Sequence, residues 1–258
     1  MNIHLLSFGN TAYYGSALTR LLVQANQWRN NNKQVFSSIT LENELTLQRK
    51  YADFWNLHGS FLLKRSRGFG YWLWKPFLIW QTLCQIPEDD ILIYLDAGCQ
   101  INTSAYSRFQ DYITLAEHHN ACVFQQANPS LLDEEYCKAD TILAVLGQHG
   151  IDTIENKVQL VASIQIMKSN TTTRSFTKSW FDWSCEDNYH YIDDSPSKHQ
   201  NSAIFKDHRH DQSIFSLLYK KEKVGTIIAD ETYWAPEWHL KGALYPFWAT
   251  RNPSSTIL

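Results

Sequence analysis

The stretch ILIYLDAGCQI, residues 91–101, is a strongly apolar run that ends on a single acid, Asp96. Short apolar runs of this kind, bounded by turn-forming residues, are typical of a strand buried on both faces of a parallel sheet. Ligands gather at the carboxyl ends of such strands. The small residues Ala97 and Gly98 that follow let a ligand approach the backbone closely, which favours a binding role for Asp96 over a plain turn cap.

Strands and helices alternate along the chain around this stretch. Residues 2–8 and 34–41 read as strands, and apolar residues at helical spacing follow each of them, over 17–28 and 41–59. A third helix is predicted from Pro76 to about residue 84, because proline suits a first helical turn. This alternation predicts an α/β fold of right-handed crossovers, with a mostly parallel sheet covered by helices on both faces.

The second half of the chain shows the same elements at less regular spacing. We predict strands and helices there at residues 104–119 (helix), 121–126 (strand), 133–147 (helix), 158–168 (strand), 173–185 (helix) and 210–221 (helix). Residues 188–210 are polar and lack periodicity, which indicates a loop. No repeat or linker divides the chain, so we expect one domain, with a first half at about 1–105 and a more variable second half at about 106–258.

The composition is that of a globular protein, with 44% hydrophobic and 19% charged residues among 258. A formal net charge of −3 gives no basic footprint, so we expect no nucleic-acid partner. Aromatic residues make up 14% of the chain, and although core packing is their commoner use, flat rings with polar edges also suit sugars and nucleobases.

The five cysteines are odd in number and include no C-x-x-C pair, which argues against both a disulfide framework and a zinc knot. No segment has the features of a signal peptide, and no apolar run approaches the roughly 18 residues that span a bilayer. We therefore expect a cytoplasmic protein, peripheral at most to the inner face of a membrane.

Three segments in order, RGFGYWLWKP (67–76), YLDAGC (94–99) and HRHDQSIFSLL (208–218), together resemble GT-A glycosyltransferases that build polysaccharides or lipopolysaccharides. The resemblance implies a Rossmann-like GT-A domain, in which about 1–105 is the nucleotide-binding half and about 106–258 is the donor-sugar and acceptor half. It also implies transfer of a hexose from a nucleotide-sugar donor, expected to be a UDP-sugar, to a glycan or lipid-linked acceptor. A looser similarity to the retaining glycogenin and lipooligosaccharide galactosyltransferase type implies transfer with retention of configuration.

Within this resemblance, Asp96 falls on the first acid of the family's Asp-x-Asp motif, which contacts the ribose or the divalent metal. Gly98 stands where the second acid, usually a direct metal ligand, would be. We assign both positions to donor binding. The departure at Gly98 leaves two alternatives for stabilising the diphosphate leaving group: Mn²⁺ or Mg²⁺ bound with other ligands, or basic side chains alone.

The segment HLKGALYPFW (239–248) resembles the His-x-x-Gly-x-x-Lys-Pro-Trp segment of the retaining type. The match implies that His239 binds the metal and that Gly242 holds the diphosphate. Tyr245 stands in place of the family's lysine, so Lys241 is the candidate for the missing charge. The alternative for His239 is a structural role within an aromatic segment.

The resemblance also assigns the catalytic residues. Asp211 and Gln212 match the Asp-Gln-Asp segment, in which the acid binds sugar hydroxyls and the glutamine lies near the anomeric carbon; Asp211 can also cap its helix. Lys75 matches a basic residue that touches the donor sugar and the acid of the Asp-x-Asp motif. A surface lysine lying over Trp74 is the competing interpretation.

Two further residues are assigned to the donor. Tyr13, or its neighbour Tyr14, lies in the first turn between strand and helix, where GT-A proteins bind the nucleobase, and Arg67 is assigned to donor binding. The strand at 160–167 resembles the family's Asn-Ala-Gly strand, with Ser163 in place of the glycine.

Other interpretations stay open. A catalytically inactive sugar-binding protein would keep the fold, with Gly98 marking the loss of activity. A nucleotidyltransferase is a further alternative. An inverting transferase would need a carboxylate base, for which the sequence offers Glu134, Glu135, Asp193 and Asp194.

Overall fold

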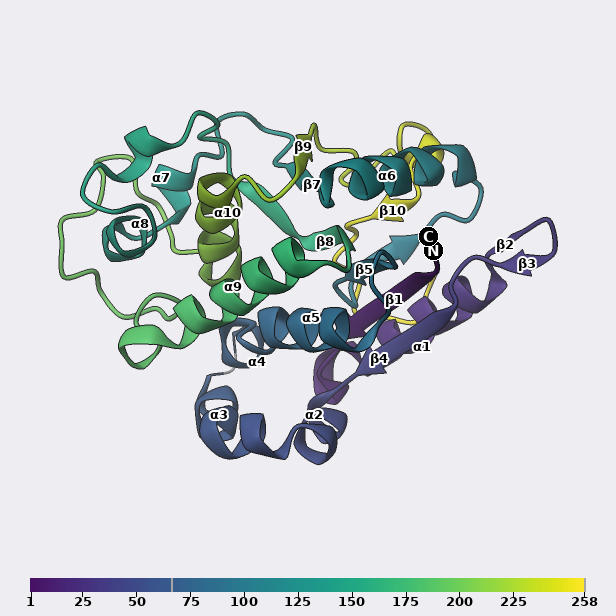
Figure 1. Cartoon of the computed structure of the whole chain (residues 1–258), viewed down its shortest axis with the longest axis horizontal. Helices are drawn as coiled ribbons and strands as arrows, with labels where there is room; N and C mark the ends of the chain where they lie inside the picture. The colour runs from purple at the N-terminus through teal and green to yellow at the C-terminus, as the bar shows by residue number, and fades with distance from the viewer. Residues whose placement is uncertain (66, 258) are drawn as a thin grey trace.

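The computed structural model describes residues 1–65 and 67–257 and shows a six-stranded sheet with the strand order β4-β1-β5-β8-β7-β9 (Figure 1). The strands are β1 (Ile3–Phe8), β4 (Ser38–Glu42), β5 (Ile91–Leu95), β7 (Ala121–Gln125), β8 (Leu160–Lys168) and β9 (Thr226–Ile228). Only β8 runs antiparallel to both of its neighbours within this sheet. The predicted mostly parallel α/β architecture is therefore confirmed.

Helices cover both faces of the sheet. They are α1 (Thr11–Gln27), α5 (Trp74–Gln85), α6 (Tyr106–His119), α9 (Thr171–Tyr189) and α10 (His210–Glu222). Helices α5, α9 and α10 lie together on one side of the sheet (Figure 1). Helices α1 and α6 contribute to the core on the other side.

Strand β5 shows why the opening run of the sequence is so apolar. All five of its residues are buried. Leu92 and Tyr94 join the core formed with α5, α9 and α10, whereas Ile91, Ile93 and Leu95 join the core formed with α1 and α6. Because successive side chains of a strand point to opposite faces, both faces must be apolar here. The run ends at Leu95, so Asp96 is the first residue beyond the strand.

Several predicted boundaries differ from the structure. The helix predicted at 41–59 is two helices, α2 (Glu44–Lys50) and α3 (Ala52–Lys64), separated at Tyr51 with φ −125° and ψ 58°. The helix predicted at 133–147 likewise divides, into α7 (Asp133–Tyr136) and α8 (Ala139–Leu146). Helical spacing of apolar residues continues across both breaks, so periodicity alone does not reveal them.

The sequence analysis did not predict the short elements, and one pair of short strands among them helps to position the C-terminal segment. Strand β6 (Gln100–Ile101) pairs antiparallel with β10 (Phe247–Trp248), which ties the C-terminal segment to the end of β5. The others are the hairpin strands β2 (Arg29–Asn30) and β3 (Lys33–Gln34), helix α4 (Gly68–Tyr71), and the 3₁₀ turns η1 (Gly150–Thr153) and η2 (Gly242–Leu244). Across residues 1–65 and 67–257, no helix is long and apolar enough to cross a membrane.

Candidate active site

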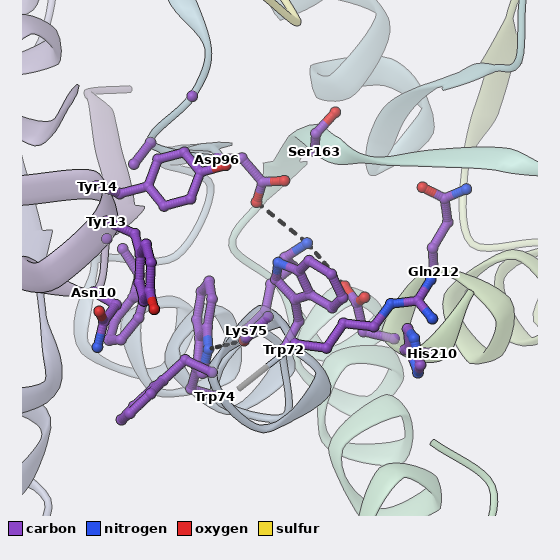
Figure 2. A pocket seen from close by; sticks show the side chains of 18 of the residues that line it. Asn10, Tyr13, Tyr14, Trp72, Trp74, Lys75, Asp96, Ser163, His210 and Gln212 are labelled. Atoms are coloured by element: carbon purple, nitrogen blue, oxygen red, sulfur yellow. Dashed lines mark hydrogen bonds and ion pairs between the residues drawn. The ribbon is translucent and has the colours of Figure 1, made fainter. Parts of the chain in front are cut away.

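A cavity of about 570 Å³ lies at the carboxyl ends of β1 and β5. Its wall combines residues from 8–14, 62–65, 67–75 and 96–99 with Ser163 on β8, the start of α10, and the C-terminal segment around Arg251. Figure 2 shows Asn10, Tyr13 and Tyr14 on one side of Lys75 and Gln212 and His210 on the other. A volume of this size is ordinary for a small-molecule site.

Lys75 joins two acids inside this cavity. Its Nζ lies 2.8 Å from Asp211 Oδ2 and 3.2 Å from Asp96 Oδ1 (Figure 2). The Lys75 and Asp211 side chains are only 3% and 4% exposed, whereas that of Asp96 is 29% exposed. The ammonium is therefore a buried bridge, and Asp96 is the most exposed member of the trio, although all three line the cavity. The alternative of a surface lysine over Trp74 is wrong.

Asp96 is oriented by its own strand. The hydroxyl of buried Tyr94, two residues earlier, donates to Asp96 Oδ1 at 2.6 Å. The Asp96 amide donates to the Ser163 carbonyl at 2.8 Å, which fixes the backbone against β8. Tyr94 and Lys75 both contact Oδ1, and no hydrogen bond or ion pair to the second oxygen, Oδ2, occurs among residues 1–65 and 67–257.

The two acids favour the charged form of Lys75, and Lys75 in turn favours the charged form of Asp211. Burial raises the pKa of Asp211 to about 6, and Lys75 opposes that rise. Burial lowers the pKa of Lys75, but Asp211 and Asp96 more than offset this, so that its pKa lies above the ordinary value. At neutral pH the lysine is therefore charged and lies between two carboxylates.

The backbone around the cavity is strained. Four non-glycine residues of its wall have positive φ: Phe69 at 49°, Trp72 at 61°, His210 at 53° and Arg251 at 54°. Such conformations cost free energy and cluster where a site needs exact placement of side chains. Gly68, with φ at 59°, has a steric reason as well, because a Cβ there would lie 2.3 Å from the Trp72 ring.

Gly98 is held tightly by the C-terminal segment. Its carbonyl accepts hydrogen bonds from Thr250 Oγ1 at 2.7 Å and from the Asn252 amide at 3.0 Å. A Cβ on Gly98 would lie 3.0 Å from Arg251 Cα. The place where the family has its second acid is therefore filled by the backbone of Arg251.

Seven of the predicted site residues line the one cavity: Tyr13, Arg67, Lys75, Asp96, Gly98, Asp211 and Gln212. Tyr13 lies in the first turn of α1 and is 71% exposed. Gln212 Nε2 donates to Gln159 Oε1 at 2.7 Å. Arg67 is paired with Asp207 at 2.9 Å, and with Asp194 at 3.6 Å. Their roles in binding remain predictions.

The structure does not bring His239, Lys241 or Gly242 to this cavity. His239 is exposed and its ring lies edge-on to Trp248, with centroids 5.3 Å apart. Lys241 pairs with Glu237 one turn away, at 2.5 Å. Buried Gly242 accepts a hydrogen bond from Trp248 Nε1 at 2.8 Å. The aromatic packing of this segment accounts for all three positions, so the predicted metal and diphosphate roles gain no support from this arrangement.

Several cavity residues were missed by sequence analysis. Arg65, Trp72, Arg209 and Arg251 line it in addition to the residues that the sequence analysis considered. Buried Gln159 was missed as well, although its Oε1 accepts from both Gln212 and Arg209. Arg251 follows β10, whose pairing with β6 has no sequence signal. Ser163 occupies the position at which the family resemblance places a glycine.

The side chains present do not fit the Mn²⁺ or Mg²⁺ that the resemblance implies. Divalent cations of this kind take several oxygen ligands. No group of three or more His, Cys, Asp or Glu residues that could hold a metal occurs within the described part of the chain. The ammonium of Lys75 already lies between Asp96 and Asp211, and position 98 leaves little space for a longer side chain.

Comparison with known proteins identifies the fold. No profile of a protein family matches the sequence, and no curated protein matches it significantly. Among solved structures, a glycosyltransferase involved in the glycosylation of the major capsid of PBCV-1 matches with a TM-score of 0.50 and 10% identity, over 96% of this chain and 93% of that one.

Two further structures give lower scores. Mouse xyloside xylosyltransferase 1 matches with a TM-score of 0.47 and 10% identity, over 96% of this chain and 97% of that one. An active-site mutant of LgtC matches with a TM-score of 0.47 and 12% identity, over 99% of this chain and 84% of that one. The likeness to the capsid glycosyltransferase confirms the GT-A fold predicted for this chain.

Proposed function

We propose that this chain is a glycosyltransferase that moves a hexose from a nucleoside diphosphate sugar to a hydroxyl group of a glycan or lipid-linked acceptor. The observation that carries the proposal is the Lys75 bridge between Asp96 and Asp211, at 3.2 and 2.8 Å. The trio lies at the carboxyl ends of parallel strands in a GT-A fold, which is where α/β proteins bind their ligands.

The nucleotide side of the cavity is formed by the first turn of α1. Tyr13 and Tyr14 supply aromatic faces there, and Tyr13 is exposed enough for a base to stack on it. The free Oδ2 of Asp96 is positioned to accept hydrogen bonds from a ribose. We assign the base and ribose of the donor to this side, with uridine as the expected nucleoside.

The sugar side is formed by the start of α10 and by β8. Asp211 and Gln212 line it together with Ser163. Lys75 holds Asp211, and Gln159 holds Gln212. Side chains fixed in this way lose little freedom when they bind sugar hydroxyls, so their hydrogen bonds contribute more to affinity and positioning.

We further propose that transfer retains the configuration at the anomeric carbon. In the described wall of the cavity, Asp96 and Asp211 are the only carboxylates, and Lys75 binds both. Glu134, Glu135, Asp193 and Asp194 are not part of that wall. An acceptor hydroxyl would thus lack the separate carboxylate base that an inverting enzyme uses.

In a retaining transfer, the bond between the anomeric carbon and the diphosphate oxygen breaks, and the oxygen leaves with the electron pair. The acceptor oxygen bonds to the carbon from the same face, and its proton passes to the departing diphosphate. Gln212, expected near the anomeric carbon, would stabilise the positive charge that develops there. The nucleoside diphosphate and the glycosylated acceptor are the two products.

The cellular role follows the same resemblance. We propose that the acceptor belongs to a surface polysaccharide or lipopolysaccharide under assembly, and that the reaction takes place in the cytoplasm or at the inner face of a membrane. The aromatic residues at the cavity, such as half-buried Trp72, are suited to a glycan acceptor.

The test is turnover of nucleotide sugars. The protein is incubated with UDP-, GDP- and ADP-hexoses, and release of the free nucleoside diphosphate is measured. We expect release with one nucleoside class, and a loss of about 100-fold or more in Asp96→Ala. Asp152→Ala is the matched control, because Asp152 is 82% exposed and outside the cavity.

Two outcomes would contradict the proposal. Tight binding of glycans without turnover of any donor would indicate an inactive sugar-binding protein. Incorporation of a sugar phosphate into a nucleotide sugar, with release of pyrophosphate from a nucleoside triphosphate, would indicate a nucleotidyltransferase.

A further inference from the structure

The cavity wall carries an excess of basic side chains. Its two carboxylates, Asp96 and Asp211, are outnumbered by five basic residues, which are Arg65, Arg67, Lys75, Arg209 and Arg251. The whole chain has a formal net charge of −3, so this positive charge is local to the site. A cleft lined by one sign of charge concentrates a ligand of the opposite sign.

Two of the five basic residues already have carboxylate partners. Lys75 binds Asp96 and Asp211, and Arg67 binds Asp207 at 2.9 Å. Lys75 is thus engaged by the protein, and Arg67 is partly neutralised. These two supply little free positive charge to a ligand.

The other three arginines are differently placed. No ion pair with a carboxylate joins Arg65, Arg209 or Arg251 in residues 1–65 and 67–257. The guanidinium of Arg209 stacks on the Tyr136 ring at 3.6 Å and donates to Gln159 Oε1 at 3.3 Å. Arg65 and Arg251 are exposed at the cavity. Three guanidinium groups therefore remain available to an anion.

Arg251 is fixed next to Gly98, two residues after the first acid of the motif. The pairing of β10 with β6 and the hydrogen bond from the Asn252 amide to the Gly98 carbonyl hold its backbone against Gly98. Its left-handed conformation, with φ at 54°, is one that arginine adopts only when the surrounding structure imposes it. The positive side chain is thus carried by the segment that fills the place of the second acid.

We propose that Arg251, with Arg65 and Arg209, binds the diphosphate of the donor without a divalent cation, so that guanidinium groups do the work that a metal does in other members of the fold. This inference rests on the proposed function. Guanidinium groups match phosphate oxygens with paired N–H donors and stay charged at any physiological pH.

The chemistry needs no further group. When the bond between the anomeric carbon and the diphosphate oxygen breaks, negative charge grows on the leaving diphosphate. Arginines that already contact its oxygens stabilise that charge as it develops. The proton of the acceptor hydroxyl ends on the same diphosphate, and no redox step or second cofactor enters the balance.

The experiment measures binding of UDP, GDP and ADP by titration calorimetry, in EDTA and again in Mn²⁺ or Mg²⁺. We expect one diphosphate to bind with an affinity that differs less than threefold between these conditions. Arg251→Ala should weaken that binding about 10- to 100-fold, the loss of one or two charge-assisted hydrogen bonds. Arg29→Ala is the matched control, since Arg29 is exposed on β2 and outside the cavity.

Thermal unfolding of each variant checks that the protein is folded. If Arg251→Ala does not fold, Arg65→Ala provides the same measurement from a segment that does not touch Gly98. Binding that EDTA abolishes, or that Mn²⁺ or Mg²⁺ strengthens tenfold or more, would overturn this inference and leave the proposed function standing. Absence of binding for every diphosphate in every condition would overturn both.

Discussion

The backbone of Arg251 packs directly against Gly98, so that a Cβ atom added to Gly98 would lie 3.0 Å from Arg251 Cα and 3.2 Å from its carbonyl carbon. In the fold family this position usually carries the second acid of the metal motif. Here the C-terminal segment packs tightly against that position, so a longer side chain would have to displace the backbone of Arg251.

We therefore expect Gly98→Asp to destabilise the protein rather than to create a metal site. Overpacking of this kind costs about 1–3 kcal/mol. Thermal unfolding with and without Mn²⁺ measures both effects, and Gly15→Asp is the control because no atom lies within 4 Å of the Cβ position there. A variant that keeps the parent stability and gains stability from Mn²⁺ would contradict the expectation.

Replacement of Lys75 should abolish activity. Lys75→Met leaves Asp211 buried without its partner, so the acid takes up a proton and its pKa rises further. We expect nucleotide release to fall about 100-fold or more, with a smaller loss in Lys75→Arg, which keeps the charge. Lys157→Met, on the surface, is the control. Unchanged turnover in Lys75→Met would show that the bridge is structural only.

The pKa of Asp211 predicts a pH dependence of stability. Burial raises this pKa from 3.8 to about 6, so the folded chain holds the proton more tightly than the unfolded chain does. The stabilisation from this group is complete below pH 3.8 and is lost as the pH rises to about 6, by roughly 3 kcal/mol. Denaturant unfolding of the parent and of Asp211→Asn across this range should show the difference; parallel curves would contradict it.

The same pKa predicts how the rate of nucleotide release falls at acidic pH. Because ionised Asp211 is the form that binds Lys75 and accepts hydrogen bonds from a sugar, nucleotide release should rise as the pH increases through about 6. The rate at limiting donor, which reports ionisations of the free enzyme, tests this when it is measured against pH. A rate that stays constant from pH 5 to 7 would mean that Asp211 is not required in its charged form.

The fold could be predicted from the sequence because the patterns that indicate it lie within single segments. The apolar run of β5 and the helical spacing that follows β1 are patterns within one segment. Asp96 could be placed at a strand end for the same reason. The contact of Lys75 with Asp96 was implied by the family resemblance, whereas the contact of Lys75 with Asp211 was not predicted, because contacts between distant segments depend on the order of strands in the sheet.

The parts that escaped prediction depend on distant backbone contacts. Strand β10 has two residues and forms only because β6 offers a partner. Its pairing brings Arg251 into the cavity and leaves His239 outside, although His239 has the better motif match. The pattern of apolar residues also gives no sign of the breaks that separate α2 from α3 and α7 from α8.

Tyr13 should contribute to nucleotide affinity by stacking. It is 71% exposed in the first turn of α1 and lines the cavity. Stacking of a base on an aromatic ring is worth about 1–3 kcal/mol, so Tyr13→Ala should weaken binding of the preferred nucleoside diphosphate about 5- to 100-fold, and Tyr13→Phe should bind like the parent. Tyr233→Ala, exposed elsewhere, is the control. If Tyr13→Ala binds the nucleoside diphosphate with the affinity of the parent, the base is assigned to Tyr14 instead.

The final prediction concerns Asp140, whose hydrogen bonds hold the loop before α10 in place. Asp140 is buried and lies 2.6 Å from His190 Nε2, and it accepts backbone hydrogen bonds from Lys198 at 2.6 Å and His199 at 2.9 Å. Burial raises the pKa of Asp140, but these hydrogen bonds outweigh burial and hold it below its ordinary value. The carboxylate is thus charged in the folded protein at neutral pH.

This clamp should support both stability and the placement of Asp211. The loop backbone at Ile192 accepts a hydrogen bond from His210 Nδ1 at 2.8 Å, and His210 precedes Asp211 directly. Asp140→Ala should therefore lower the free energy of unfolding by about 3–5 kcal/mol and reduce nucleotide release. The stabilisation by Asp140 should also fade as the pH drops below 3.8, since its folded pKa is depressed. Denaturant unfolding at several pH values measures this, with Asp152→Ala as control; a loss under 1 kcal/mol would show that the loop is held without Asp140.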